Sequence, residues 1–110
     1  MDSGNKSELK AIIIKFGATW CGPCKRIKAF CDKCHTELPN NVLYFDIDID
    51  NNMELYIALK SKKMINGIPT ILGYAKKPDR NMNSWYASDI SVLGSDHNNI
   101  HNFFNCIKKY

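Results

Sequence analysis

The sequence predicts one α/β domain, a three-layer sandwich whose central mixed sheet of about four strands carries helices on both faces. The chain has 110 residues, of which 45% are hydrophobic and 24% charged, enough for one hydrophobic core. Apolar runs of strand length alternate with segments of helical periodicity, in the order βαβαββα. Since no repeat or low-complexity tract interrupts this order, residues 1–110 are expected to form a single domain.

The first half of the chain predicts a strand-helix-strand unit. Residues 11–17 are short, mostly β-branched and carry one charge, as in a central strand covered on both faces. Apolar residues at helical spacing predict a helix over 23–37, and a proline suits its first turn. Residues 42–49 alternate and predict a second strand. Because such a unit is right-handed, Cys21 and Cys24 should lie at the carboxyl edge of the sheet.

The second half predicts a helix, a hairpin and a last helix. Capping oxygens at residues 50–52 precede a helix that starts at Met53, and Asn66-Gly67 ends the segment that follows. Residues 70–74 and a stretch within 90–93 predict a hairpin.

The last helix is capped by Ser95 or Asp96. Its apolar stripe consists of Ile100, Phe103, Phe104 and Ile107. The polar residues 76–89 inside the hairpin fit no element.

Composition excludes several classes of protein. The net charge is +4, but the basic residues are spread among acids, so no nucleic-acid partner is expected. The apolar run 11–14 is too short for a signal-peptide core or a membrane span, and a cytoplasmic protein without a membrane partner is expected. Five cysteines without an export signal do not indicate a secreted disulfide framework. Redox catalysis, metal binding or burial must explain them.

Cys21 and Cys24 form a two-spaced pair at the predicted helix start. Free backbone N–H groups and the positive end of the helix dipole stabilise a thiolate there. Three nearby side chains add positive charge: Lys25, Arg26 and Lys28. We expect Cys21, less covered by the helix, to be the nucleophile and Cys24, one turn further, to resolve the mixed disulfide. Gly22 and Pro23 keep the turn tight.

Three features, in the right order, resemble the thioredoxin family. Trp20-Cys21-Gly22-Pro23-Cys24-Lys25 resembles its active-site motif, Gly67-Ile68-Pro69-Thr70 its cis-proline loop, and Gly94 the glycine before its last helix. The resemblance implies a thioredoxin-like fold, a cis Ile68-Pro69 bond facing the dithiol, and an Ile68 backbone that pairs with substrate. The implied substrate-binding residues are Trp20, Gly22, Pro23, Ile68, Pro69 and Gly94.

The resemblance also implies a function. The protein would be a monomeric protein-disulfide reductase that maintains cell redox homeostasis through its redox-active disulfide, with no cofactor of its own. A reduction potential near about −270 mV would make it a reductant of disulfide-containing proteins. The implied electron donor is an NADPH-dependent flavoprotein reductase.

The sequence departs from the family pattern below the dithiol. Lys15 stands where thioredoxins usually carry a buried acid, and the alignment places Asp46 where they tend to carry a lysine. We therefore expect a charge-swapped Lys15–Asp46 pair that tunes the thiols. The alternative is that Lys15 extends to solvent and pairs with nothing.

Two further departures concern the sheet. Because only twenty residues precede Cys21, the first edge strand of the family should be missing, with a short helical turn at 7–10 in its place. The stretch between the hairpin strands is long, and its tip should lie away from the dithiol. Trp85 and Tyr86 there should pack locally or contact a partner.

Cys31 and Cys34 form a second two-spaced pair. On one continuous helix, Cys24 and Cys31 lie about 10 Å apart along the axis, too far to share a zinc ion. We expect both to fill the core, with a regulatory disulfide as the alternative. Four other side chains are expected to be peripheral or solvated, without metal: Cys106, His35, His97 and His101.

Two other functions stay open. One is a zinc-binding or structural interaction module that uses the fold without redox turnover. The other keeps the dithiol chemistry but oxidises or isomerises partner disulfides.

Overall fold

The computed structural model describes residues 8–77 and 82–110. Its elements follow the predicted order and are β1 (Ala11–Gly17), α1 (Gly22–Thr36), β2 (Val42–Asp48), the 3-10 turn η2 (Ile49–Asn51), α2 (Met53–Ser61), β3 (Thr70–Ala75), the 3-10 turn η3 (Met82–Ser84), β4 (Ile90–Leu93) and α3 (His97–Lys108).

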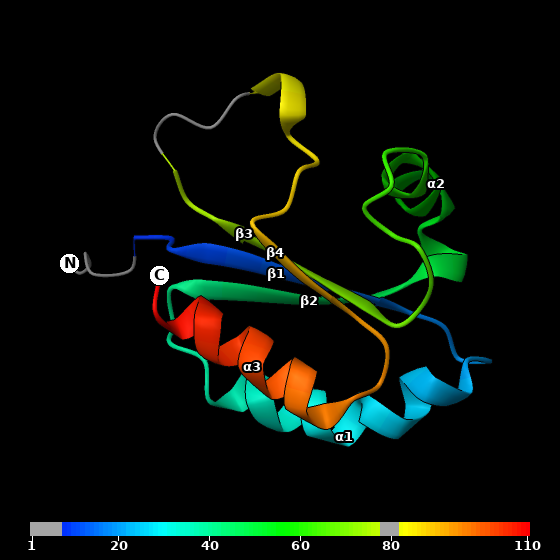
Figure 1. The fold of residues 1–110 in the computed structure, drawn as a ribbon, viewed down its shortest axis with the longest axis horizontal. Coiled ribbons are helices and arrows are strands. Elements are labelled where there is room, and N and C mark those ends of the chain that lie inside the picture. The colour runs from blue at the N-terminus through cyan, green and yellow to red at the C-terminus, as the bar shows by residue number, and fades with distance from the viewer. Residues whose placement is uncertain (1–7, 78–81) are drawn as a thin grey trace.

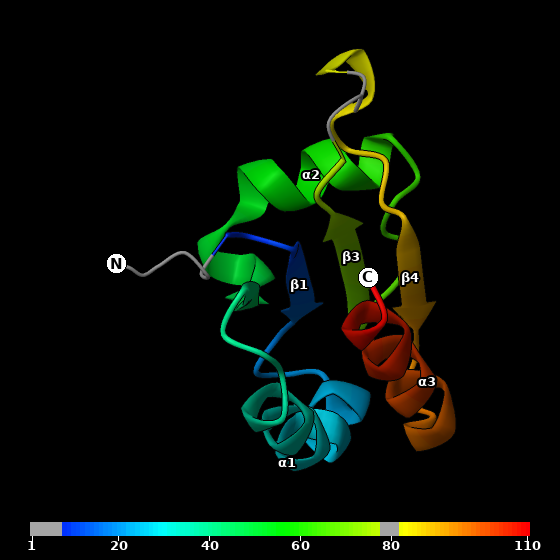
Figure 2. The same ribbon diagram turned by 90° about the vertical axis from the view of Figure 1, so that its left-hand side faces the viewer.

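The four strands form one mixed sheet in the order β2-β1-β3-β4. The β1 and β2 strands are parallel, whereas β3 runs antiparallel to both β1 and β4. Helices α1 and α3 lie side by side on one face of the sheet, and α2 lies on the other face (Figures 1 and 2). This arrangement confirms the predicted four-stranded sandwich, in which β1 is an inner strand and β2 an edge.

Two apolar clusters hold the layers together. The larger one joins the sheet to α1 and α3, and its buried members are Ala11, Ile13, Ile27, Cys31, Cys34, Val42, Ile71, Ile100, Phe103, Phe104 and Ile107. The smaller one lies under α2 and includes the dithiol, and its buried members are Phe16, Ala18, Cys21, Cys24, Ile49, Leu59, Ile65 and Leu72. The predicted stripe of α3 is therefore confirmed as core.

Gly73 allows α3 to approach the sheet closely. A Cβ atom on Gly73 would lie 2.7 Å from Ile90 Cγ2 and 2.8 Å from Ile107 Cδ1. The Ile107 side chain has no room to move because it is fully buried, whereas Ile90 is half-buried. Any larger residue at position 73 would push the helix away from the sheet.

Several predicted ends of elements differ from the structure. Helix α1 covers Gly22–Thr36 instead of 23–37, and β3 ends at Ala75 instead of residue 74. The second strand ends at Asp48 instead of residue 49, because the Asp48 carboxylate accepts the Asp50 N–H at 2.9 Å and starts the η2 turn. The prediction that a side chain from residues 50–52 caps α2 was wrong. Asn52 occupies the N-cap position but makes no side-chain capping hydrogen bond. Helix α2 then ends before Asn66-Gly67, since Lys63 adopts a φ of 65°.

The connection between β3 and β4 leaves the end of β3 that is remote from α1's first turn (Figure 1). Within its described part, the Tyr74 hydroxyl donates to the Tyr86 carbonyl oxygen at 2.9 Å, and the Trp85 and Tyr86 rings meet edge to face. Both aromatic residues thus pack locally, one of the two expected roles. Residues 78–81 and Ser7 lie outside the described part of the chain.

Near the N-terminus, residues 8–10 are not helical, so this part of the expected helical turn at 7–10 was wrong. Across residues 8–77 and 82–110, no helix is both long and apolar enough to cross a membrane.

Candidate active site

Cys21 occupies the N-cap of α1. Its backbone is extended, with φ −91° and ψ 113°, and its sulfur accepts the Cys24 N–H at 3.3 Å. Pro23 lies in the first turn, where its missing N–H leaves no donor unsatisfied. The Cys21 sulfur thus faces the free amides and positive dipole of a fifteen-residue helix.

Cys24 lies one turn further, seated against the end of β1. Burial is the main cause that raises the pKa of its thiol from 9.0 to about 11, followed by the hydrogen bond with Cys21. Hydrogen bonding at Ala18 and the positive charge of Lys15 act in the opposite direction and lower this pKa. A Cβ atom on Gly17 would lie 3.2 Å from the Cys24 sulfur, so the glycine leaves space for this sulfur at the end of β1.

The two cysteines are equally covered in the reduced state. Cys21 is 6% exposed and Cys24 is 5% exposed, and neither forms a disulfide. The 67–69 loop contributes to the cover of Cys21, since the Ile68 carbonyl oxygen lies against its thiol. The hydrogen bond from the Cys24 amide distinguishes the two sulfurs instead.

The loop that faces the dithiol contains a cis Ile68-Pro69 bond, as the sequence motif implied. The Cys21 thiol is 3.9 Å from the Ile68 carbonyl oxygen. On the other side, the Gly94 amide donates to the Pro69 carbonyl oxygen at 2.9 Å. Gly94 has a φ of 104°, a conformation that favours glycine. The structure therefore brings Cys21, Ile68, Pro69 and Gly94 together.

Trp20 lies beside the dithiol and is 64% exposed. Its indole N–H donates to Asp50 Oδ2 at 2.9 Å, which fixes an otherwise free ring. The sequence indicated Asp50 only as a capping residue, so this role was missed. Its position just after β2, at the same sheet edge as the dithiol, was the available signal. Gly22 is exposed and Pro23 half-buried in the same turn.

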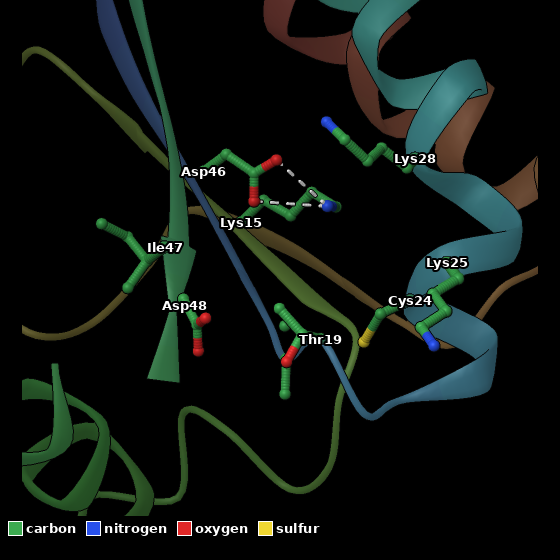
Figure 3. Close-up of a pocket in the computed structure, with 10 residues that line it drawn as sticks. Lys15, Thr19, Cys24, Lys25, Lys28, Asp46, Ile47 and Asp48 are labelled. Atoms are coloured by element: carbon green, nitrogen blue, oxygen red, sulfur yellow. Dashed lines mark hydrogen bonds and ion pairs between the residues drawn. The ribbon is translucent and has the colours of Figure 1, made fainter. Parts of the chain in front are cut away.

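Lys15 and Asp46 form an ion pair below Cys24. They are direct neighbours in the parallel register of β1 and β2, and Lys15 Nζ lies 3.3 Å and 3.4 Å from the two Asp46 oxygens. The Lys15 side chain is 5% exposed, so the alternative that it reaches solvent unpaired was wrong. Figure 3 shows both charged ends and the Cys24 sulfur in the space between the sheet and α1.

This space is a cavity of about 440 Å³ that opens to solvent. Its lining residues are Lys15, Gly17, Ala18, Thr19, Cys24, Lys25, Lys28, Asp46, Ile47 and Asp48. The basic residues Lys25 and Lys28 of α1 thus face it together with the ion pair, as do the carboxylates of β2.

The remaining cysteines lie outside this arrangement. Cys31 and Cys34 are buried in the larger cluster, as expected, and burial raises the pKa of each thiol, that of Cys31 to about 11. Cys106 is exposed on α3. Helix α1 is continuous through its three cysteines, and the described residues contain no group of three or more side chains placed to hold a metal ion.

The expected surface histidines are exposed, although two of them stack on aromatic rings. His97 stacks on Phe30 and His35 on Tyr44, each with ring centroids 4.4 Å apart.

Two thiols at the amino end of a helix, opposite a cis-proline loop on a four-stranded mixed sheet, define the class of dithiol proteins with a thioredoxin fold. The thioredoxin family model matches residues 3–89 of the sequence. The chain belongs to the thioredoxin family.

Curated and solved relatives are thioredoxins. Mouse thioredoxin is 37% identical over 71 residues, which cover 61% of this chain and 59% of the relative. The pig protein is 40% identical over 60 residues, or 54% of this chain and 56% of the relative. This chain therefore spans less than two thirds of the length of these relatives.

Solved thioredoxin structures match a larger share of this chain than the curated sequences do. The crystal structure of thioredoxin from Plasmodium falciparum covers 90% of this chain and is covered to 72%, with a TM-score of 0.68 and 27% identity. Thioredoxin from Fasciola hepatica, at 20% identity and a TM-score of 0.69 over 94% of this chain and 86% of its own, shares the fold.

Proposed function

We propose that this chain is a protein thiol-disulfide oxidoreductase that reduces disulfides in other proteins through a cycle of Cys21 and Cys24. The single observation that carries the proposal is the Cys21 sulfur at the N-cap of α1, 3.3 Å from the Cys24 amide and opposite the cis Ile68-Pro69 bond. A sulfur that accepts an amide hydrogen at a helix start is stabilised as a thiolate, the form that attacks disulfides.

In the first step, the Cys21 thiolate attacks one sulfur of a substrate disulfide. A bond forms between Cys21 and that sulfur, the substrate S–S bond breaks, and the other substrate sulfur leaves as a thiolate that takes a proton from solvent. Cys21 has to be uncovered for this attack because it is buried against Ile68. A substrate that pairs with the Ile68 backbone would replace that contact.

In the second step, Cys24 loses its proton and attacks the Cys21 sulfur. The Cys21–Cys24 disulfide forms, the bond from Cys21 to the substrate breaks, and the substrate leaves with both sulfurs reduced. Two electrons have then passed from the dithiol to the substrate. The high pKa of Cys24 keeps its proton in place until this step, which favours Cys21 as the attacking residue.

The substrate surface surrounds the dithiol. It consists of Trp20, Gly22, Pro23, Ile68, Pro69 and Gly94. Trp20 and Gly22 are exposed, and Pro23 and Ile68 are half-buried, so an extended segment of a partner protein has apolar area to bind next to the Ile68 backbone.

The cycle needs an electron donor, and an NADPH-dependent flavoprotein reductase is the class that we propose. The protein would act as a monomer in the cytoplasm. This compartment is reducing, so disulfides in its substrates are transient.

Reduction of insulin by dithiothreitol tests the proposal. The chain should accelerate precipitation of the insulin chains, and Cys21→Ser should abolish that effect. Cys106→Ser is the matched control, because it removes an exposed thiol on α3 and should leave the rate unchanged. Equal rates for the wild type and Cys21→Ser would exclude the mechanism.

Metal analysis and a redox titration separate the other functions. A zinc-binding module would contain about one zinc per chain and show no reductase activity. Equilibration with glutathione gives the reduction potential: a value near about −270 mV supports a reductant, and a value near about −120 mV an oxidant.

A further inference from the structure

A buried ammonium group lies below the resolving cysteine. Lys15 on β1 and Asp46 on β2 are cross-strand neighbours, and both side chains enter the cavity that the Cys24 sulfur lines (Figure 3). A charged group that is removed from water has to be paired or it loses its charge. Asp46 provides that pairing at 3.3 Å.

The two partners are unequally exposed. The Lys15 side chain is 5% exposed, whereas the Asp46 side chain is 40% exposed. Water screens a half-exposed carboxylate more strongly than it screens a buried ammonium. The charge of the buried ammonium acts on the Cys24 thiol and lowers its pKa, although the pair is formally neutral.

The other charged and titratable groups around Cys24 do not reverse this sign. Those that line the cavity are Lys25 and Lys28 from α1 and Asp48 from β2, and Cys21 lies at the N-cap of the same helix. Lys28 is paired with Asp32, and Asp48 accepts a backbone N–H in the η2 turn. Lys15 is the buried cation among these groups, and its charge favours ionisation of Cys24.

We propose that the Lys15 ammonium stabilises the Cys24 thiolate that resolves the mixed disulfide, and that Asp46 is the positioning residue that keeps the ammonium charged and in place. This inference rests on the proposed function, since it concerns the second step of that cycle. Cys24 gives its proton to solvent through the open side of the cavity. Its sulfur then bonds to Cys21, and the substrate sulfur leaves with the electron pair of the broken bond.

Rapid mixing with a limiting amount of a disulfide of two thionitrobenzoate groups tests this inference. The attack by Cys21 releases the first coloured thiolate, and the attack by Cys24 on the mixed disulfide releases the second. At slightly acidic pH, where Cys24 is protonated, the second phase should be the slower one. Its dependence on pH gives the titration midpoint of Cys24.

Lys15→Met should slow the second phase by about tenfold at neutral pH, as expected when the titration midpoint rises by about one pH unit. The first phase should change by less than about twofold. Lys15→Arg keeps the charge and should restore most of the second-phase rate. An unchanged second phase and midpoint in Lys15→Met would overturn the inference.

The double variant Lys15→Met/Asp46→Leu separates an electrostatic role from a structural one. It replaces the ion pair by two apolar side chains that can still pack between β1 and β2, so the second phase should slow at least as much as in Lys15→Met. A double variant with wild-type kinetics would mean that the charge of Lys15 has no part in the second step. If Lys15→Met fails to fold, this double variant and Lys15→Arg still decide the question.

Failure of the proposed function would look different. A wild-type chain that releases no coloured thiolate in either phase lacks a reactive Cys21, whatever the role of Lys15. A chain that shows both phases, with a second phase insensitive to Lys15, keeps the proposed function and loses only the further inference.

Discussion

The indole N–H of Trp20 lies 2.9 Å from Asp50 Oδ2, so the most exposed large apolar side chain next to the dithiol is held in one orientation. An exposed tryptophan loses rotational freedom when a partner binds it, and a prior hydrogen bond reduces that cost. The contact joins the loop before α1 to the turn after β2 and so places an apolar ring beside the Cys21 sulfur.

Replacing Asp50 by alanine should free this ring. We expect insulin reduction to slow by about threefold to tenfold, while the free energy of unfolding falls by less than about 1 kcal/mol, because the hydrogen bond is exposed. Trp20 fluorescence, measured in a Trp85→Phe background, should become less dependent on the redox state. Glu37→Ala, at the far end of α1, is the control and should change neither rate nor fluorescence. A wild-type rate in Asp50→Ala would show that the ring needs no fixing.

Two glycines should respond to alanine for different physical reasons. Gly73→Ala places a Cβ 2.7 Å from Ile90 and should lower the free energy of unfolding by about 2–3 kcal/mol through displacement of α3. Gly94→Ala meets no atom within 4 Å but must adopt a φ of 104°, which should cost about 1–2 kcal/mol.

Urea unfolding and insulin reduction measure the two effects. Gly94→Ala should also slow insulin reduction, since the Gly94 amide holds the Pro69 carbonyl, whereas folded Gly73→Ala should keep its rate. A larger loss of activity in Gly73→Ala than in Gly94→Ala would contradict this assignment.

The reduced protein should lose stability at alkaline pH. Burial raises the pKa of Cys24 from 9.0 to about 11, so the folded chain holds this proton more tightly than the unfolded chain. The stabilisation is complete below the unfolded value and is lost as pH rises from about 9 to about 11. The urea concentration at the unfolding midpoint should therefore decrease between neutral pH and about pH 10. This decrease should be larger for the reduced protein than for the oxidised protein, in which Cys24 forms a disulfide. Equal falls in the two redox states would contradict the expected titration of Cys24.

Cys31 and Cys34 should be structural. Because Cys31 is fully buried, Cys31→Ala should lower the free energy of unfolding by about 1–2 kcal/mol, and Cys34→Ala by less. Insulin reduction should stay within about twofold of wild type in both variants. Mass spectrometry of the oxidised, alkylated protein should find one disulfide, between Cys21 and Cys24. A second disulfide between Cys31 and Cys34 would instead support a regulatory pair.

Local patterns predicted most of the fold. The helical spacing in α1 and the stripe of α3 are each decided by burial of one face, and the apolar run of β1 is decided by burial of both faces. All three elements were confirmed within about a residue. The Lys15–Asp46 contact was also predicted, from the resemblance to the thioredoxin family, and the parallel register of β1 and β2 makes the two residues neighbours.

What the sequence did not predict depends on tertiary contacts. Helix α2 ends because Lys63 adopts a left-handed conformation without being glycine, and no local signal marks such a residue. Asp50 is a residue type that often caps helices, and its contact with Trp20 depends on the tertiary fold. Leu43 and Phe45 lie on the apolar side of the alternating pattern in β2, yet they are 43% and 45% exposed in this edge strand.

Trapping the mixed disulfide tests the dithiol cycle most directly. In Cys24→Ser, which keeps Cys21 at the N-cap but removes the resolving thiol, incubation with a disulfide-containing protein should accumulate a covalent complex. Mass spectrometry should place the bond at Cys21, and reductant should release it. A complex bonded through Cys31, Cys34 or Cys106, or no complex at all, would contradict the account.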